Sequence, residues 1–144
     1  MRITVGDTKL FFDVEGAKFV PDGPHMRERP SVITIHGGPG FDHSSFKPLL
    51  SDLTDIAQVI YFDQRGHGRS DHGTAQCWNL DMWAEDVRRL CETLDIEHPI
   101  ILGESFNPAL VQFEEFDDAS HLLLREHPDK VLTRIKRFIR DVAN

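Results

Sequence analysis

The sequence has little cysteine, a deficit of basic charge and no long apolar run. Its two cysteines, Cys77 and Cys91, do not form a Cys-x-x-Cys pair. We therefore expect neither a disulfide framework nor a zinc ribbon, and a reducing compartment is the default expectation. The chain of 144 residues carries 16 lysines and arginines against 24 aspartates and glutamates, a formal net charge of -8. This balance argues against nucleic acid and anionic membranes as partners, because both favour a basic surface.

Membrane insertion and secretion are not expected either. No apolar run approaches the roughly 18 residues of a membrane span, and the first residues lack a signal-peptide stretch. The sequence thus predicts a cytoplasmic protein. Its length favours a single domain over residues 1–144. The segment 21–30, rich in proline and glycine, is predicted to be a surface loop.

Strand and helix patterns alternate along the chain. Arg2–Val5 and Lys9–Val14 predict a β-hairpin around Gly6 and Asp7. Continuous apolar runs predict strands buried on both faces at 31–35, 59–62 and 100–102, with a weaker strand at 110–113. Apolar residues at helical spacing predict helices over 46–56, 80–94 and 131–142. This order predicts an α/β fold, a mostly parallel sheet with helices on both faces, whose ligands bind beyond the carboxyl ends of the strands.

A glycine-rich segment follows the run 31–35. It comprises His36, Gly37, Gly38, Pro39 and Gly40. Such a backbone can approach a substrate closely and can direct N–H groups at a developing oxyanion. The alternative is a tight strand-to-helix turn, but turns seldom need this many glycines.

A second loop, Asp63–Asp71, follows the run 59–62 and alternates glycines with charged residues. His67, Asp71 and His72 could suggest a metal, but no His-x-x-x-His pattern on a helix supports one. We expect a compact loop that buttresses the site, and no metal.

The third segment, Gly103-Glu104-Ser105-Phe106-Asn107, follows the run 100–102. It nearly fits Gly-x-Ser-x-Gly, the sharp turn that exposes a nucleophilic serine above a sheet. Ser105 is thus the candidate nucleophile, and the N–H of Phe106 a candidate oxyanion donor. A serine needs a base, and only His121 and His127 follow it. We favour His121, since His127 precedes Pro128 at a helix start, where a capping or surface role is expected.

Together these segments resemble the α/β-hydrolases, within them the proline iminopeptidase-like branch. The segment 36–40 is similar to that branch's oxyanion loop, 61–70 to its signature after the following strand, and 103–106 to its nucleophile elbow. Ala119-Ser120-His121 is similar to the stretch with the catalytic histidine. The resemblance implies a serine hydrolase acting on peptide, amide or ester bonds of a small molecule or short peptide. It implies no metal and no organic cofactor.

The chain also departs from that family. Members are roughly twice as long, and Phe106 is followed almost at once by Asn107–Phe113, which looks like the family's last strand. We interpret residues 1–106 as the amino-terminal half through the elbow and 107–144 as the C-terminal strand, histidine loop and helix, joined by an internal deletion near Phe106 and Asn107. The lid, the central strands and the usual catalytic acid are missing. The acid remains unknown; the nearby acidic residues are Glu114, Glu115, Asp117 and Asp118.

Two functions follow from this interpretation. The first is a serine hydrolase with Ser105 as nucleophile, His121 as base and the N–H groups of Gly38 and Phe106 as oxyanion hole. The alternative is a catalytically inactive, shortened hydrolase, or a chain that binds a partner. Removing the central strands would bare apolar surface, so we expect the isolated chain to be poorly active and to form homo-oligomers.

Overall fold

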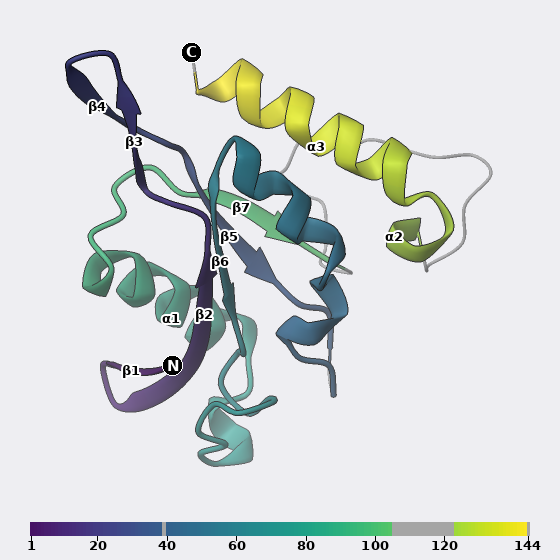
Figure 1. Cartoon of the computed structure of the whole chain (residues 1–144). Helices are drawn as coiled ribbons and strands as arrows, with labels where there is room; N and C mark the ends of the chain where they lie inside the picture. Colours follow the sequence, from purple (N-terminus) through teal and green to yellow (C-terminus); the bar gives the residue numbers. More distant parts are fainter. Residues whose placement is uncertain (39, 105–122, 144) are drawn as a thin grey trace.

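The computed structural model describes residues 1–38, 40–104 and 123–143 (Figure 1). These residues build a five-stranded sheet and a separate hairpin. The sheet has the order β1-β2-β6-β5-β7. Its strands are β1 (Arg2–Val5), β2 (Thr8–Glu15), β6 (Gln58–Phe62), β5 (Ser31–Ile35) and β7 (Ile100–Gly103).

The sheet is parallel over β6, β5 and β7 and antiparallel over β1, β2 and β6. β5 runs parallel to both β6 and β7. β2 pairs antiparallel with β6 and with β1, and the β1–β2 turn contains Gly6 with a φ of 58°. Such a positive φ favours glycine. The predicted hairpin, and the predicted strands at 31–35, 59–62 and 100–102, are therefore confirmed.

Helices cover both faces of this sheet (Figure 1). α1 (Leu80–Thr93) lies on one face, where Leu90 joins a buried cluster with Leu10 and Ile33. On the other face, η2 (Leu49–Asp55) and α3 (Pro128–Val142) contribute to a second cluster, which includes Ile139. The α/β fold with helices on both faces is thus confirmed.

The three parallel strands differ in their burial. Val32 and Ile33 of β5 have no exposed surface, which explains why this strand is a continuous apolar run. β7 is only partly buried along its length, and Ile101 is 43% exposed. The expectation that β7 is buried on both faces is therefore wrong for the described residues. The predicted strand at 110–113 lies outside them.

The predicted helix over 46–56 is replaced by two short 3-10 helices, η1 (His43–Phe46) and η2. Pro48 stands between them and has no backbone N–H to continue a helical ladder. Phe46 and Leu50 are nevertheless buried, as their spacing predicts. The spacing thus identified the apolar face correctly but not the hydrogen-bonding pattern.

The segment 21–30 is not a loop throughout. β3 (Phe19–Asp22) and β4 (His25–Glu28) form an antiparallel two-stranded hairpin, in which Gly23 at the turn has a φ of 59°. Pro21 lies within β3 at an exposed position of this small hairpin, where an absent N–H costs no central ladder bond.

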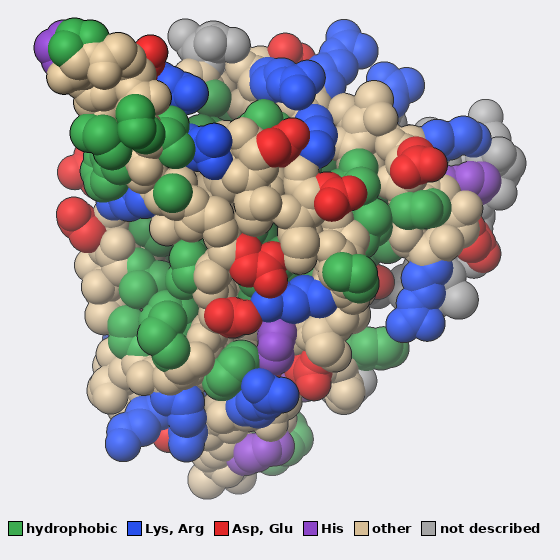
Figure 2. All heavy atoms as spheres, viewed as in Figure 1, with side chains coloured by type: hydrophobic (Ala, Val, Ile, Leu, Met, Phe, Trp, Pro, Cys, Tyr) green, Lys and Arg blue, Asp and Glu red, His purple; other side chains and the backbone are tan. Residues whose placement is uncertain are grey.

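The remaining helices are a short η3 (Ala75–Cys77), a short α2 (Leu123–Glu126) and the two long helices. Asn79 caps the start of α1, and its side chain accepts a hydrogen bond from the Met82 N–H. α3 has Pro128 in its first turn, as predicted, and His127 takes the position before it. Acidic and basic side chains are interspersed on the face shown in Figure 2. Over the described ranges, none of the helices combines the length and apolarity that a bilayer span requires.

Candidate active site

Three predicted site segments follow strands that end on the same side of the sheet. β5, β6 and β7 are parallel, so their carboxyl ends lie together, and Ile35 is the register partner of Gly103. One residue further, the Glu104 N–H donates to the Ile35 carbonyl over 3.0 Å. The segment that leads to Ser105 therefore begins beside the segment that starts at His36.

The His36 ring is fully buried and is held by two backbone groups. Its Nε2 accepts a hydrogen bond from the Gln64 N–H at 3.1 Å, and its Nδ1 lies 2.7 Å from the Gly37 carbonyl oxygen. Because the carbonyl can only accept, Nδ1 carries the proton and Nε2 the lone pair. Burial lowers the pKa of His36, which stabilises this neutral ring.

This ring fixes the start of the glycine-rich loop. The Gly37 carbonyl belongs to the same planar peptide as the Gly38 N–H, and in a trans peptide the two point in opposite directions. Holding the carbonyl of Gly37 therefore also orients the N–H of Gly38. No residue in the described ranges accepts a hydrogen bond from that N–H.

Asp63, directly after β6, organises the second loop. One carboxylate oxygen accepts hydrogen bonds from the His43 N–H at 2.9 Å and from His43 Nδ1 at 2.6 Å. The other accepts from the Arg69 N–H at 2.8 Å. A Cβ on Gly68 would lie 2.3 Å from this second oxygen, and the φ of Gly68 is +49°. The loop thus closes tightly around a buried carboxylate and needs glycine at position 68.

Asp42, His43 and Asp63 are also the one metal-like cluster among the described residues, since their ligand atoms lie within 4.8 Å of one another. These atoms are already in use. Asp42 Oδ1 accepts from the Ser44 N–H, and His43 Nδ1 is bonded to Asp63. The cluster fits a structural hydrogen-bond network rather than a metal centre.

The other metal candidate in the sequence, around His67, Asp71 and His72, serves a structural purpose at Asp71. Its carboxylate accepts from the Lys9 N–H at 3.0 Å and forms an ion pair with Arg2. These contacts tie the end of the loop to the β1–β2 hairpin. The loop 63–71 is thus held at its end to the β1–β2 hairpin, and at its start Gln64 is bonded to His36 in the loop after β5.

A buried ion pair also anchors the loop 63–71 to α1. The Arg65 guanidinium donates to both oxygens of Asp86 on α1, at 2.8 and 2.9 Å, and to Asp7 at 2.7 Å. Both side chains of the Arg65–Asp86 pair are almost completely buried. The bond to Arg65 also lowers the pKa of Asp7.

The predicted site residues divide into two groups. His36, Gly37, Gly38 and Gly40 lie in the loop after β5, at the carboxyl edge. The other predicted residues lie outside the described residues; these are Pro39, Ser105, Phe106, His121 and the four acidic residues at 114, 115, 117 and 118. The Ser105–His121 pair therefore stays a prediction.

Sequence reasoning missed the roles of His43 and Gln64. His43 binds a carboxylate twenty positions away, and Gln64 donates hydrogen bonds to two atoms of a residue twenty-eight positions away, the ring Nε2 and the carbonyl oxygen of His36. No periodicity links such positions. One signal in the sequence pointed to such contacts. Asp63 and Gln64 come immediately after a buried strand, where polar side chains need hydrogen-bond partners.

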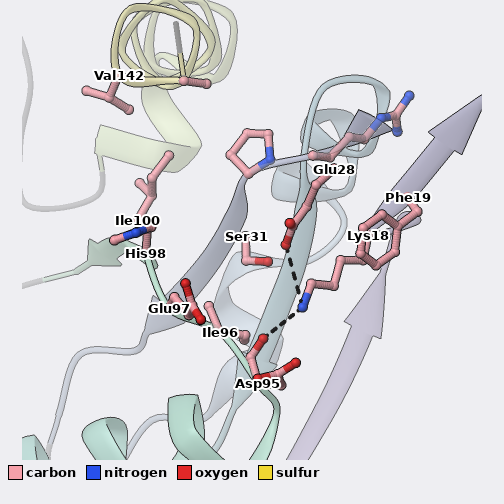
Figure 3. Close-up of a pocket in the computed structure, with 13 residues that line it drawn as sticks. Lys18, Phe19, Glu28, Ser31, Asp95, Ile96, Glu97, His98, Ile100 and Val142 are labelled. Atoms are coloured by element: carbon pink, nitrogen blue, oxygen red, sulfur yellow. Dashed lines mark hydrogen bonds and ion pairs between the residues drawn. The ribbon is translucent and has the colours of Figure 1, made fainter. Parts of the chain in front are cut away.

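A cavity of about 440 Å³ lies elsewhere, at the opposite end of the sheet (Figure 3). It is lined by the β3–β4 hairpin, by Ser31 at the start of β5, by the segment before β7 and by the end of α3. Strands β5 and β7 begin here, so the cavity is separated from the site by their length. None of the predicted site residues lines it.

Known proteins resemble this chain over the region that contains the strands and loops of the candidate site. The α/β hydrolase fold family matches residues 30–106, more than half of the chain, and the chain belongs to that family. Its similarity lies with proline iminopeptidases. It is 35% identical to the enzyme of Heyndrickxia coagulans over 109 residues, which are 72% of this chain and 36% of the relative. Over 119 residues it is 32% identical to proline iminopeptidase PfmaB of Pestalotiopsis fici, covering 80% of this chain and 42% of the relative.

Solved structures show the same fold. The proline iminopeptidase-related protein TTHA1809 from Thermus thermophilus superposes with a TM-score of 0.62 at 29% identity, over 72% of this chain and 35% of that one. The chain spans between 29% and 42% of the length of the proline iminopeptidases from Clostridioides difficile, Pestalotiopsis fici and Heyndrickxia coagulans.

Proposed function

We propose that the chain is a serine hydrolase that acts on peptide, amide or ester bonds, with Ser105 as nucleophile and His121 as base. One observation carries the proposal. The Glu104 N–H is bonded to the Ile35 carbonyl, so the residue before Ser105 lies directly beside the start of the loop that holds Gly38. Nucleophile and oxyanion donor must be neighbours in such an enzyme.

The proposed reaction uses the chain's own groups. His121 takes the proton of the Ser105 hydroxyl as Oγ attacks the substrate carbonyl carbon. The N–H groups of Gly38 and Phe106 donate to the resulting oxyanion. Collapse of this intermediate breaks the bond to the leaving group, which receives the proton from His121. Water then attacks the acyl group while His121 takes its proton. Collapse of the second intermediate breaks the bond to Ser105 Oγ, which receives the proton from His121.

Support for the Gly38 donor is the most detailed. His36 holds the neighbouring carbonyl, and the Gly38 N–H has no acceptor within the described ranges. A preorganised donor of this kind typically stabilises a transition state by about 2.7–4 kcal/mol. The names of the relatives suggest an aminopeptidase substrate, but the chain spans well under half of their length, so the substrate is part of the proposal.

A fluorophosphonate probe tests the proposal, because it reacts with activated serines. We expect intact mass spectrometry to show one adduct, and peptide mapping to place it on Ser105. Ser105→Ala and His121→Gln should abolish it, whereas Ser44→Ala, at an exposed serine of η1, should not change it. Unchanged labelling of Ser105→Ala, or no labelling of the folded wild-type chain, would contradict the proposal. The second result would favour the inactive or partner-binding alternative.

A further inference from the structure

Three histidines lie buried at the carboxyl ends of the parallel strands, and they use their ring nitrogens in different ways. His36 has no exposed surface, and His43 and His67 are each 7% exposed. His43 Nδ1 lies 2.6 Å from a carboxylate oxygen of Asp63, and His67 Nδ1 lies 3.1 Å from the Arg65 carbonyl oxygen. Both oxygens accept, so the rings of His43 and His67 are donors in these bonds.

Within the described residues, His36 is the one of the three whose ring accepts a hydrogen bond. Its Nε2 accepts from the Gln64 backbone N–H, which can only donate, so the bond requires a lone pair on Nε2. A proton on this nitrogen would set one N–H against another and abolish the bond. A second proton on His43 or His67 leaves their donor bonds to oxygen in place.

The bond from Gln64 to the His36 ring connects the loop after β5 with the loop 63–71. The Gln64 side chain adds a second connection, because its amide Nε2 donates to the His36 carbonyl oxygen at 2.8 Å. This second bond involves no titrating atom. Loss of the first bond would therefore free the His36 ring, together with the Gly37–Gly38 peptide that the ring orients, while the His36 backbone stays held.

The surroundings of His36 favour the neutral ring. Burial lowers its pKa, and the His67 ring, with its centre 5.3 Å away, acts in the same direction. The bond to the Gly37 carbonyl and the carboxylates of Asp63 and Asp42 oppose this effect, and the pKa is nevertheless lowered. A ring released into water would have the ordinary histidine pKa of about 6.5.

We propose that the contact between His36 Nε2 and the Gln64 N–H is an acid-sensitive latch, which opens when His36 is protonated and then releases the start of the glycine-rich loop. The open arrangement binds the proton more readily, so the opening equilibrium increases as the pH falls below about 6.5. The increase is at most about tenfold between about pH 7.5 and pH 5.5.

The latch does not rest on the proposed function, because all of its atoms belong to described residues. It does bear on that function. The Gly37–Gly38 peptide loses its fixed orientation when the latch opens, so acid would remove the preorganised Gly38 donor from the proposed oxyanion hole.

Amide hydrogen exchange followed by NMR tests the latch in the wild-type chain at about pH 7.5 and pH 5.5. Protection factors are compared, because they remove the direct effect of pH on the chemical exchange rate. We expect the protection factor of the Gln64 N–H to fall by up to about tenfold in acid. The Asp63 N–H is a matched control in the same loop, since it donates to the Phe11 carbonyl at 3.0 Å, and its protection should change much less.

Two variants sharpen the test. His36→Asn removes the titrating ring, so the protection of Gln64 should become independent of pH. His72→Asn changes an exposed histidine and should keep the pH dependence of the wild type. If His36→Asn does not fold, the comparison of Gln64 with Asp63 in the wild-type chain still decides.

Three results would overturn the latch: no fall in Gln64 protection, an equal fall at Asp63, or an undiminished pH dependence in His36→Asn. An equal fall at Asp63 would mean that acid unfolds the loop 63–71 as a whole. Fluorophosphonate labelling of Ser105 is a separate readout. Gln64 protection that falls in a chain whose Ser105 stays unlabelled would support the latch and contradict the hydrolase.

Discussion

The two ends of the parallel strands contain polar residues in very different states. At the carboxyl end, Asp63, Gln64 and Arg65 are at most 3% exposed, and the side chain of each is hydrogen-bonded. At the amino end, Glu28 and Arg29 are exposed or half-buried around the cavity, and the Lys18–Glu28 pair has a separation of 3.5 Å. Burying a polar group without partners is costly, so only the carboxyl end needed a complete hydrogen-bond network.

This difference shows why the amino-end cavity is the weaker candidate for a site. A site must hold its groups in a fixed geometry. His36 and His67 at the carboxyl end are each fixed by a hydrogen bond and by packing, whereas exposed side chains such as Phe19 and Glu28 border part of the amino-end cavity. Fixed geometry, and not cavity volume, distinguishes the two ends of the sheet.

The strongest test of this comparison is to remove Asp86. Asp86→Ala leaves the buried Arg65 guanidinium with only the exposed Asp7 as ion-pair partner. Removing one member of a buried pair typically costs about 3–5 kcal/mol, so we expect a loss of this size in the free energy of unfolding. Urea denaturation followed by circular dichroism measures it. Asp7→Ala is the matched control, and a loss as large as that of Asp86→Ala would mean that burial does not distinguish the two pairs.

The second test removes the charge at the centre of the loop. Asp63→Asn keeps the size of the side chain but turns one acceptor oxygen into a donor that faces the N–H groups of His43 or Arg69. Leaving a buried donor unsatisfied costs about 1–3 kcal/mol, and we expect a loss of stability in that range. Asp52→Asn, at a surface position of η2, should be close to neutral in the same urea titration. An equal effect of both substitutions would contradict the assigned role of Asp63.

The sequence predicted the sheet well because burial leaves a clear pattern. The continuous run 31–35 coincides with β5, since both of its faces are covered. The β3–β4 hairpin was missed because Pro21 and Gly23 are typical loop residues, and an exposed two-stranded hairpin tolerates both. The helical spacing over 46–56 indicated which side faces the core, but its i, i+3 pairs also occur in 3-10 helices.

The candidate site was predictable in part. The position of His36 and Gly38 follows from the strand that precedes them, because parallel strands bring their ends together. Their partners were not predictable. The bonds from Gln64 to His36 and from His43 to Asp63 depend on how two loops pack, which no local pattern encodes.

A smaller change in the free energy of unfolding is expected when the pH is lowered, because His36 titrates. Burial lowers its pKa in the folded chain, so below about pH 6.5, the ordinary histidine pKa, the unfolded chain binds the proton more readily. His36 therefore contributes stability that is complete above that pH and is lost as the pH falls towards its folded pKa. The slope is at most about 1.4 kcal/mol per pH unit.

His36→Asn removes this titration while keeping a donor near the position of Nδ1. Urea midpoints of both proteins between about pH 5 and pH 8 measure the difference. We expect the two stability curves to converge as the pH falls below about 6.5. Parallel curves over the whole range would show that His36 does not titrate differently in the folded and unfolded chains.

The smallest change in stability is expected from substitutions at the amino ends of the parallel strands. Lys18 donates to the Asp95 carbonyl at 2.7 Å and pairs with Glu28, whose side chain is 57% exposed (Figure 3). Solvent and salt screen such pairs, which contribute about 0–1 kcal/mol. We therefore expect Lys18→Met to change the free energy of unfolding by less than about 1 kcal/mol, and Glu28→Gln by less still. A loss comparable to that of Asp86→Ala would show that the amino end is as firmly held as the carboxyl end, and the cavity there would become a site to investigate.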